Sequence, residues 1–199
     1  MADDYGYQVG YNCVIILQIN TAFINSYIKN SNEDNISLGD LVLFAIAHNL
    51  KDYPEFNSYF DEKTVLYPNI NVGYSIKILE KLPKKAVIKD ADKKTAMEIS
   101  KEIKKFAFLY MRDKLTEEDT QGASISLLNF SSFNAYSVST PLYTGQSALI
   151  SIASEHEVND SKFFNLCLAY DVRVADCQRA LDFLNAVRET LEGKDKHPD

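Results

Sequence analysis

One stretch near the C-terminal end restricts the fold of this chain more than any other. Residues 168–184, LAYDVRVADCQRALDFL, begin as an apolar strand, pass through a short charged turn and continue as a helix with one apolar face. A strand that leads directly into an amphipathic helix requires a sheet on which that helix can pack. We therefore expect an α/β domain.

The charged turn in this stretch raises a question about function. Its side chains follow an Asp-x-Arg-x-x-Asp pattern, formed by Asp171, Arg173 and Asp176, which is typical of a catalytic loop. Carboxyl groups have a pKa of about 4 and guanidinium groups a pKa above about 12, so none of these side chains exchanges protons readily at neutral pH. The turn is either an active site that uses another proton acceptor or one that has lost its chemistry.

The rest of the chain alternates predicted strands and helices. Strands are expected at residues 11–19, 64–68, 70–78, 84–90, 123–130, 146–153 and 163–170. Helices are expected at residues 21–30, from Ser37 to the residues before Pro54, at 95–114 and at 176–192. Ser37 and Asp40 form a capping-box pattern, and the apolar strand 11–19 is expected to be buried. This order predicts an α/β or α+β domain.

The composition fits a single domain. The chain has 199 residues, of which 46% are apolar, and this supplies one ordinary hydrophobic core. We expect residues 1–10 to be a flexible N-terminus, 11–192 to be the folded domain and 193–199 to be a polar tail. The net charge of −7 argues against nucleic acid as a partner, because phosphate binding needs a basic face.

The cysteines and the apolar runs restrict the compartment. Cys13, Cys167 and Cys177 are odd in number and form no Cys-x-x-Cys pair, which argues against a disulfide framework and against a structural metal site. No apolar run approaches the roughly 18 residues that cross a membrane, and the acidic start after Met1 does not resemble a signal peptide. We expect a soluble protein of the cytoplasm or the mitochondrial matrix, without a membrane partner.

Side chains of the usual catalytic kinds are few. His48 lies in a predicted amphipathic helix, His156 in a predicted polar turn and His197 in the tail, so we expect structural or surface roles for all three. The chain contains no HExxH, GxSxG or phosphate-loop motif. Cys177 has Arg173 and Arg179 close in sequence, which favours a thiolate nucleophile, but a small residue packed at a helix start is the preferred interpretation.

Six segments in order resemble the catalytic core of the dihydrolipoamide acyltransferases of 2-oxoacid dehydrogenase complexes, over residues 11–192. The first is a helix that starts near 38 and ends in Pro54-Glu55-Phe56-Asn57, and it is followed by a strand with Asn71-Val72-Gly73. Next come the strand, long helix and glycine-led strand within 87–130. The last are the segment TPLYTGQSALISI and the closing motif with the last helix in LAYDVRVADCQRALDFLNAVRETLE. The resemblance implies the fold of chloramphenicol acetyltransferase, an α/β (α+β) two-layer sandwich with helices on a mixed sheet, and a homotrimer.

The chain departs from this family at the general base. The resemblance implies that a histidine in the closing Asp-His-Arg-x-x-Asp-Gly motif takes the proton from the thiol of CoA or dihydrolipoamide. That position holds Val172, which has no lone pair to offer. Arg173 and Asp176 remain, and the resemblance gives them a role in ordering the loop, while the glycine of the motif is Cys177.

Two further parts of the implied site are altered. A serine or threonine hydroxyl from a neighbouring subunit is expected to stabilise the tetrahedral oxyanion. Counting back from Gln146 through Asn129 places this position on Leu128, and a slip of one or two residues places it on Ser126. The family's Gly-Leu-x-x-Pro-Val segment reads LPKKAV at residues 82–87, so its glycine and its proline are both missing.

These departures favour a catalytically inactive acyltransferase-like subunit with a structural or adaptor role. We expect a homotrimer, alone or beside an active acyltransferase core, and no large cage, because the final EGKDKHPD is charged. An acyltransferase of altered mechanism and a module that binds CoA or an acyl ligand are the alternatives. Lys84, Lys85 and Lys89 suit CoA phosphates, although a solvated charge run is the preferred interpretation. CoA or dihydrolipoamide is a ligand only if the channel is open, and no other cofactor is expected.

Overall fold

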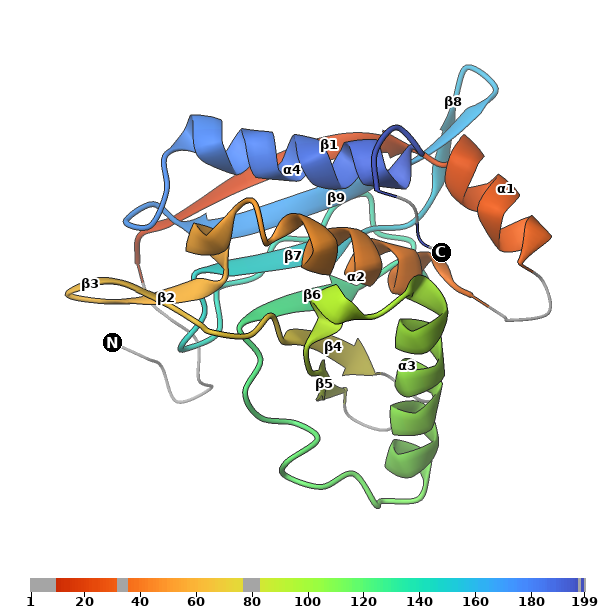
Figure 1. The fold of residues 1–199 in the computed structure, drawn as a ribbon. Coiled ribbons are helices and arrows are strands. Elements are labelled where there is room, and N and C mark those ends of the chain that lie inside the picture. Colours follow the sequence, from red (N-terminus) through yellow and green to blue (C-terminus); the bar gives the residue numbers. More distant parts are fainter. Residues whose placement is uncertain (1–9, 32–35, 77–82, 197, 199) are drawn as a thin grey trace.

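A computed structural model describes residues 10–31, 36–76, 83–196 and 198. These residues form a mixed sheet with helices packed on it (Figure 1), which confirms the expected fold class. The strands are β1 Asn12–Asn20, β2 Ser58–Asp61, β3 Lys63–Leu66, β4 Val72–Ile76, β5 Lys84–Ile88, β6 Ile125–Asn129, β7 Ala148–Ile152, β8 His156–Val158 and β9 Ser161–Asp171. The helices are α1 Ala22–Asn30, α2 Leu38–Asn49, α3 Ala96–Met111 and α4 Cys177–Leu191, with short 3-10 turns at Pro54–Phe56 and Ala91–Lys93.

The main sheet of the described residues has the strand order β1-β9-β7-β6-β4-β5, and β8 pairs with β9. The central strands β4, β6 and β7 run parallel, whereas β1, β9 and β5 pair antiparallel with their neighbours. Helices α2, α3 and α4 cover one face (Figure 1). Because side chains alternate along a strand, β6, β7 and β9 contribute to two separate apolar clusters, one on each face.

Helix α2 lies at the centre of the helical layer. Ser37 caps it as predicted: its hydroxyl accepts from the amide of Asp40, and the Asp40 carboxylate accepts from the amide of Ser37. Nearly every residue of α2 is buried, because the sheet covers one side and helices α3 and α4 pack against the others. Helix α3 begins with an equivalent box formed by Thr95 and Glu98.

Several predictions about local structure were wrong. The strand expected to be buried, β1, lies at the edge of the sheet and exposes Val14 and Ile16. His156 lies in strand β8 instead of a polar turn. The short strand β2 was missed, and Pro54 begins a 3-10 turn after α2 has already ended at Asn49.

The ends of the chain differ in what the structure describes. Of the expected flexible N-terminus, only Gly10 falls within the described residues. In the expected polar tail, the ammonium of Lys196 donates to the carbonyl oxygen of His48 and to the carboxylate of Asp52, at 3.0 and 2.8 Å. Pro198 is buried, so this part of the tail packs onto the helical layer.

An aromatic cluster joins three elements beneath α4. The ring of Phe56 stacks on Phe183 of α4 with centroids 4.9 Å apart, and it meets Tyr170 of β9 edge to face at 6.1 Å. All three side chains are fully buried. Phe56 therefore fixes the turn that follows α2 to both the sheet and the last helix.

Replacement of Phe56 by alanine is expected to lower the free energy of unfolding by about 3–5 kcal/mol, because a fully buried ring leaves a cavity. Phe108→Ala is the matched control, since that ring is 46% exposed on α3, and we expect a change within about 0.5 kcal/mol. Urea titrations at one protein concentration measure both. Equal losses in the two variants would contradict the proposed role of the cluster.

Candidate active site

The loop between β9 and α4 carries Val172, at the position where the resemblance implies a general base. Val172 follows the last residue of β9, and its amide donates to the carbonyl oxygen of Tyr11 at 2.9 Å. Its side chain is 47% exposed. The main chain is therefore fixed while the side chain faces solvent, and a valine there neither accepts nor donates a proton.

An ion pair holds this loop in place. The Asp171 carboxylate is fully buried, and the guanidinium of Arg173 donates to both of its oxygens, with Nη2 at 2.5 Å from Oδ2. The same guanidinium lies over the rings of Tyr11 and Phe60, at 4.4 and 4.2 Å from their centroids. Hydrogen bonding to Asp171 raises the pKa of Arg173, so this side chain stays charged and transfers no proton.

Asp176 is the N-cap of α4. Its carboxylate accepts from the amide of Arg179 at 2.8 Å, which satisfies a donor that the first helical turn leaves free. The Arg179 side chain forms an ion pair with Glu55 and donates to the carbonyl oxygen of Asp52. These contacts connect the start of α4 to the Pro54–Phe56 turn. The side chains of Asp176 and Arg179 are therefore engaged in structural contacts.

Cys177 lies beside the hydroxyl of Tyr170. It is exposed at the first position of α4, and its thiol interacts with the buried hydroxyl of Tyr170, as does the thiol of Cys13. Burial and both thiols raise the pKa of Tyr170 well above its usual value. A hydroxyl that holds its proton this firmly is not a base for either thiol.

The expected oxyanion position lies on β6, on the face of the sheet that the helices do not cover, here called the outer face. Leu128 is buried there in an apolar cluster with Leu142, Leu149 and Ala169. Ser126 points to the same face and is fully buried. Its hydroxyl has no hydrogen-bond partner among the described residues. Neither side chain presents a donor to a substrate from within this protomer.

The two parts of the implied site lie far apart in one protomer. Ser126 pairs with Leu149 of β7, which pairs with Ala169 of β9. Strands lie about 4.8 Å apart and rise about 3.3 Å per residue, so Val172, three residues beyond Ala169, is on the order of 14 Å from Ser126. One carbonyl group cannot contact both positions in a single copy of the chain.

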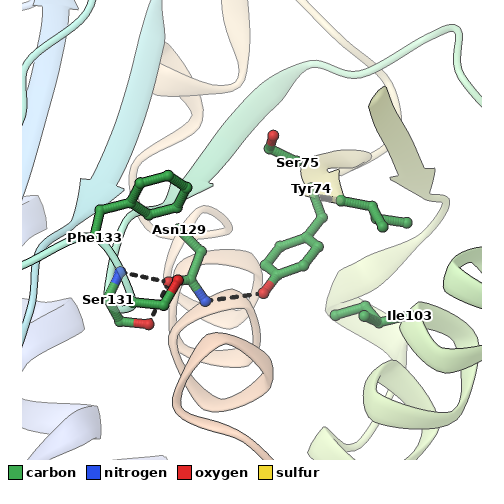
Figure 2. Close-up of a pocket in the computed structure, with 8 residues that line it drawn as sticks. Tyr74, Ser75, Ile103, Asn129, Ser131 and Phe133 are labelled. Carbon is green, nitrogen blue, oxygen red and sulfur yellow. Dashed lines mark hydrogen bonds between the residues drawn. The ribbon is translucent and has the colours of Figure 1, made fainter. Parts of the chain in front are cut away.

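Asn129 belongs to a different site, shown in Figure 2. Its amide nitrogen donates to the hydroxyl of Tyr74 at 3.0 Å, and its amide oxygen accepts from the amide and hydroxyl of Ser131 at 3.0 and 2.7 Å. Burial raises the pKa of Tyr74. The residues that line this open pocket of about 540 Å³ are Tyr74, Ser75, Ile76, Ile103, Asn129, Ser131, Ser132 and Phe133.

This pocket presents hydroxyl, amide and aromatic groups. Its lining among the described residues contains no carboxylate and no imidazole. The sequence did not single out Tyr74, although it follows the Asn71-Val72-Gly73 pattern and points to the helical side of β4. The pocket depends on where the segment after β6 lies, which the sequence does not reveal.

The described histidines have structural contacts. His48 Nε2 lies 2.9 Å from the carbonyl oxygen of Lys94, and its ring stacks on Phe44; burial lowers its pKa. His156 Nε2 lies 3.0 Å from the side-chain amide nitrogen of Gln18. His197 lies outside the described residues. Among the residues that are described, no three metal-binding side chains cluster, and none of the helices is both long and apolar enough to cross a bilayer.

Comparison with known proteins identifies relatives of this fold. Residues 14–197 match the family model for the 2-oxoacid dehydrogenases acyltransferase (catalytic domain). The chain is 31% identical over 173 residues to the dihydrolipoyllysine-residue succinyltransferase component of the 2-oxoglutarate dehydrogenase complex of Bartonella vinsonii subsp. berkhoffii, covering 81% of this chain and 42% of that protein. It is 27% identical over 179 residues to the acetyltransferase component of the pyruvate dehydrogenase complex of Rickettsia conorii, covering 85% and 43%. The chain thus spans less than half the length of these relatives.

Solved structures share the architecture at lower identity. A truncated catalytic core of the 2-oxoacid dehydrogenase multienzyme complex from Thermoplasma acidophilum superposes with a TM-score of 0.86 at 20% identity, covering 93% of this chain and 88% of that one. The cubic core of a pyruvate dehydrogenase multienzyme complex gives 0.82 at 17%, covering 90% and 81%. Chloramphenicol acetyltransferase gives 0.67 at 16%, covering 94% and 91%.

Replacement of Arg173 by alanine is expected to lower the free energy of unfolding by about 3 kcal/mol, because it leaves the buried Asp171 carboxylate without its cation. Adding Asp171→Asn to that variant removes the buried charge and is expected to restore part of the loss. Arg112→Ala, at an exposed arginine over the ring of Phe108, is the control and should change stability by less than about 0.5 kcal/mol. Denaturant titrations measure all three, and a harmless Arg173→Ala would refute the role of the pair.

Proposed function

This chain belongs to the acyltransferase (catalytic domain) family of the 2-oxoacid dehydrogenases, and from that membership we propose that it is a catalytically inactive member with a structural or adaptor role. The observation that carries the proposal is Val172. Its main chain is fixed by the hydrogen bond to Tyr11, while its exposed side chain can neither accept nor donate a proton. The fold of the family is retained around this position.

Two losses act together on the chemistry. General-base catalysis typically contributes about 10²–10⁴-fold, and one oxyanion donor contributes about 10²–10³-fold. Val172 supplies no base, Leu128 supplies no donor, and Ser126 is fully buried. A site that lacks both groups keeps only the advantage of bringing two substrates together.

Assembly as a homotrimer is part of the proposal. The edge strand β1 exposes Val14 and Ile16, which are 42% and 47% accessible, and Tyr11 and Val172 extend this apolar surface at one end. Exposed apolar side chains in a row favour burial against another copy. The separation of Val172 and Ser126 also supports a site shared between copies. Partners of the trimer would be an active acyltransferase core or other dehydrogenase-complex subunits, since the relatives are components of such complexes.

A binding function is the second candidate, and the pocket around Tyr74 and Asn129 favours it. An open pocket of about 540 Å³ with amide, hydroxyl and aromatic groups suits a small ligand held without chemistry. Calorimetric titration with CoA distinguishes this candidate. Saturable heat with the wild type that disappears in Asn129→Ala would favour a binding module. The absence of heat with the wild type would exclude CoA binding as the function.

We expect the purified chain to transfer no acetyl group from acetyl-CoA to dihydrolipoamide above the uncatalysed rate, because base and oxyanion donor are both missing. A thiol-release assay with a product check by mass spectrometry measures this. Val172→His returns a base to the loop, and a gain of about tenfold or more would mean that the channel is open. Wild-type transfer at a rate typical of working acyltransferases would overturn the inactive assignment.

Replacement of Ile16 by glutamate is expected to dissociate the trimer, because it places a charge in the apolar row on β1. Sedimentation velocity of the wild type and the variant measures the mass. Phe108→Glu, at a comparably exposed apolar position on α3, is the control and should leave the mass unchanged. A monomeric wild type, or equal behaviour of both variants, would exclude β1 as the interface.

A further inference from the structure

Lys85 on β5 is held on the outer face of the sheet at two points. Its methylenes cross the backbone of Gly73, where an added Cβ atom would lie 2.8 Å from Lys85 Cδ. Its ammonium nitrogen lies 4.7 Å from the ring centroid of Tyr143, in the segment between β6 and β7. The side chain is thus half-buried between a glycine backbone and an aromatic ring.

No carboxylate balances the charge of Lys85 among the residues that the structure describes. Nearby lysines differ: Lys89 pairs with Glu118 at 3.4 Å and Lys94 pairs with Glu102 at 2.6 Å. Glu117 lines the same pocket as Lys85, but its carboxylate accepts from the side chain of Gln121. The ammonium of Lys85 therefore meets an aromatic ring and pairs with none of the described carboxylates.

Partial burial without a counter-charge favours the neutral amine. Desolvation lowers the pKa of Lys85, and no charged neighbour contributes to the shift. The face of the Tyr143 ring attracts the cation and acts in the opposite direction, but an aromatic face replaces only part of the lost hydration. At a given pH, Lys85 has a larger fraction of nucleophilic amine than an exposed lysine has.

Lys85 is only partly buried, so a reagent can reach its side chain. Lys85 borders an open pocket of about 460 Å³, whose lining also includes Pro83, Thr116 and Thr120. That volume holds a small acyl group together with part of its carrier. Strand β5 forms the edge of the sheet opposite to β1.

From this arrangement we propose that Lys85 is a site of covalent acylation by acyl thioesters. The neutral ε-amine attacks the thioester carbonyl carbon, the new C–N bond forms and the C–S bond breaks. The thiolate leaves and takes up the proton that the amine loses, so the products are an amide on Lys85 and a free thiol. The reaction needs no oxidant, metal or general base, and each amine reacts once.

This inference does not rest on the proposed function. An inactive scaffold and an active acyltransferase would both carry the same lysine in the same pocket. Acylation is measured on the protein itself without a thiol acceptor, whereas the scaffold function is tested by transfer to dihydrolipoamide. Failure of one leaves the other in place.

The test exposes the full chain to acetyl-CoA at several pH values and follows the occupancy of each lysine by peptide mass spectrometry. We expect Lys85 to be acetylated about fivefold faster than its exposed neighbours Lys84 and Lys89 near neutral pH, and its rate to level off at a lower pH than theirs. Lys85→Arg keeps the charge and should remove the fastest site. Occupancy of Lys85 equal to or below that of Lys84 and Lys89 would overturn the proposal.

A matched pair of variants tests the role of the aromatic ring. Tyr143→Phe keeps the ring over the amine and should retain the preference for Lys85. Tyr143→Ala hydrates the amine and should bring its rate to within about twofold of the rate at Lys84. Circular dichroism establishes that both variants are folded, and the ranking of lysines in the wild type decides the proposal if either is not. Loss of the preference in Tyr143→Phe, or its retention in Tyr143→Ala, would overturn the assigned cause.

Discussion

The buried carboxylate of Asp171 is the constraint on which the surrounding structure depends. A charge in that position is tolerated only with a cation beside it, and Arg173 reaches both oxygens from two residues away. The pair bends the chain out of β9, and the rings of Tyr11 and Phe60 pack on the guanidinium. The start of β1, the β2–β3 hairpin and the entry to α4 are therefore fixed by one ion pair.

The local features predicted from the sequence are those that depend on nearest neighbours. The capping box at Ser37 needs only side chains three residues apart, and α2 begins where that pattern predicted. The apolar run of β1 predicted a strand correctly but its burial wrongly, because burial depends on what lies beside Val14 and Ile16 in space. The β2 strand and the β8 strand are short hairpin pieces whose pairing partners, and not their composition, define them.

The features of the candidate site likewise divide into those that the sequence predicts and those that depend on the arrangement of the strands. The sequence alone identifies Val172 as unable to act as a base, because that conclusion needs only the identity of the residue. The sequence left the expected oxyanion position open between two residues, Leu128 and Ser126. Both lie buried on the outer face, two strands away from β9. That separation is a property of the sheet order, which no local pattern encodes. The contacts of Asn129 with Tyr74 and of Lys85 with Tyr143 likewise join segments far apart in sequence.

The loss of chemistry proposed for this loop is compatible with its fold. Residue 172 contributes to the fold through its amide, which bonds to Tyr11, and its side chain packs against little. A histidine and a valine therefore place similar demands on the loop, while only the histidine can accept a proton. The valine instead exposes methyl groups beside Tyr11, at the end of the apolar row on β1, and each Å² of such surface buried against another copy contributes about 25 cal/mol. Under the proposed function, a valine at this position both lacks a proton acceptor and adds to the surface proposed for assembly, which would link an inactive site to a structural role.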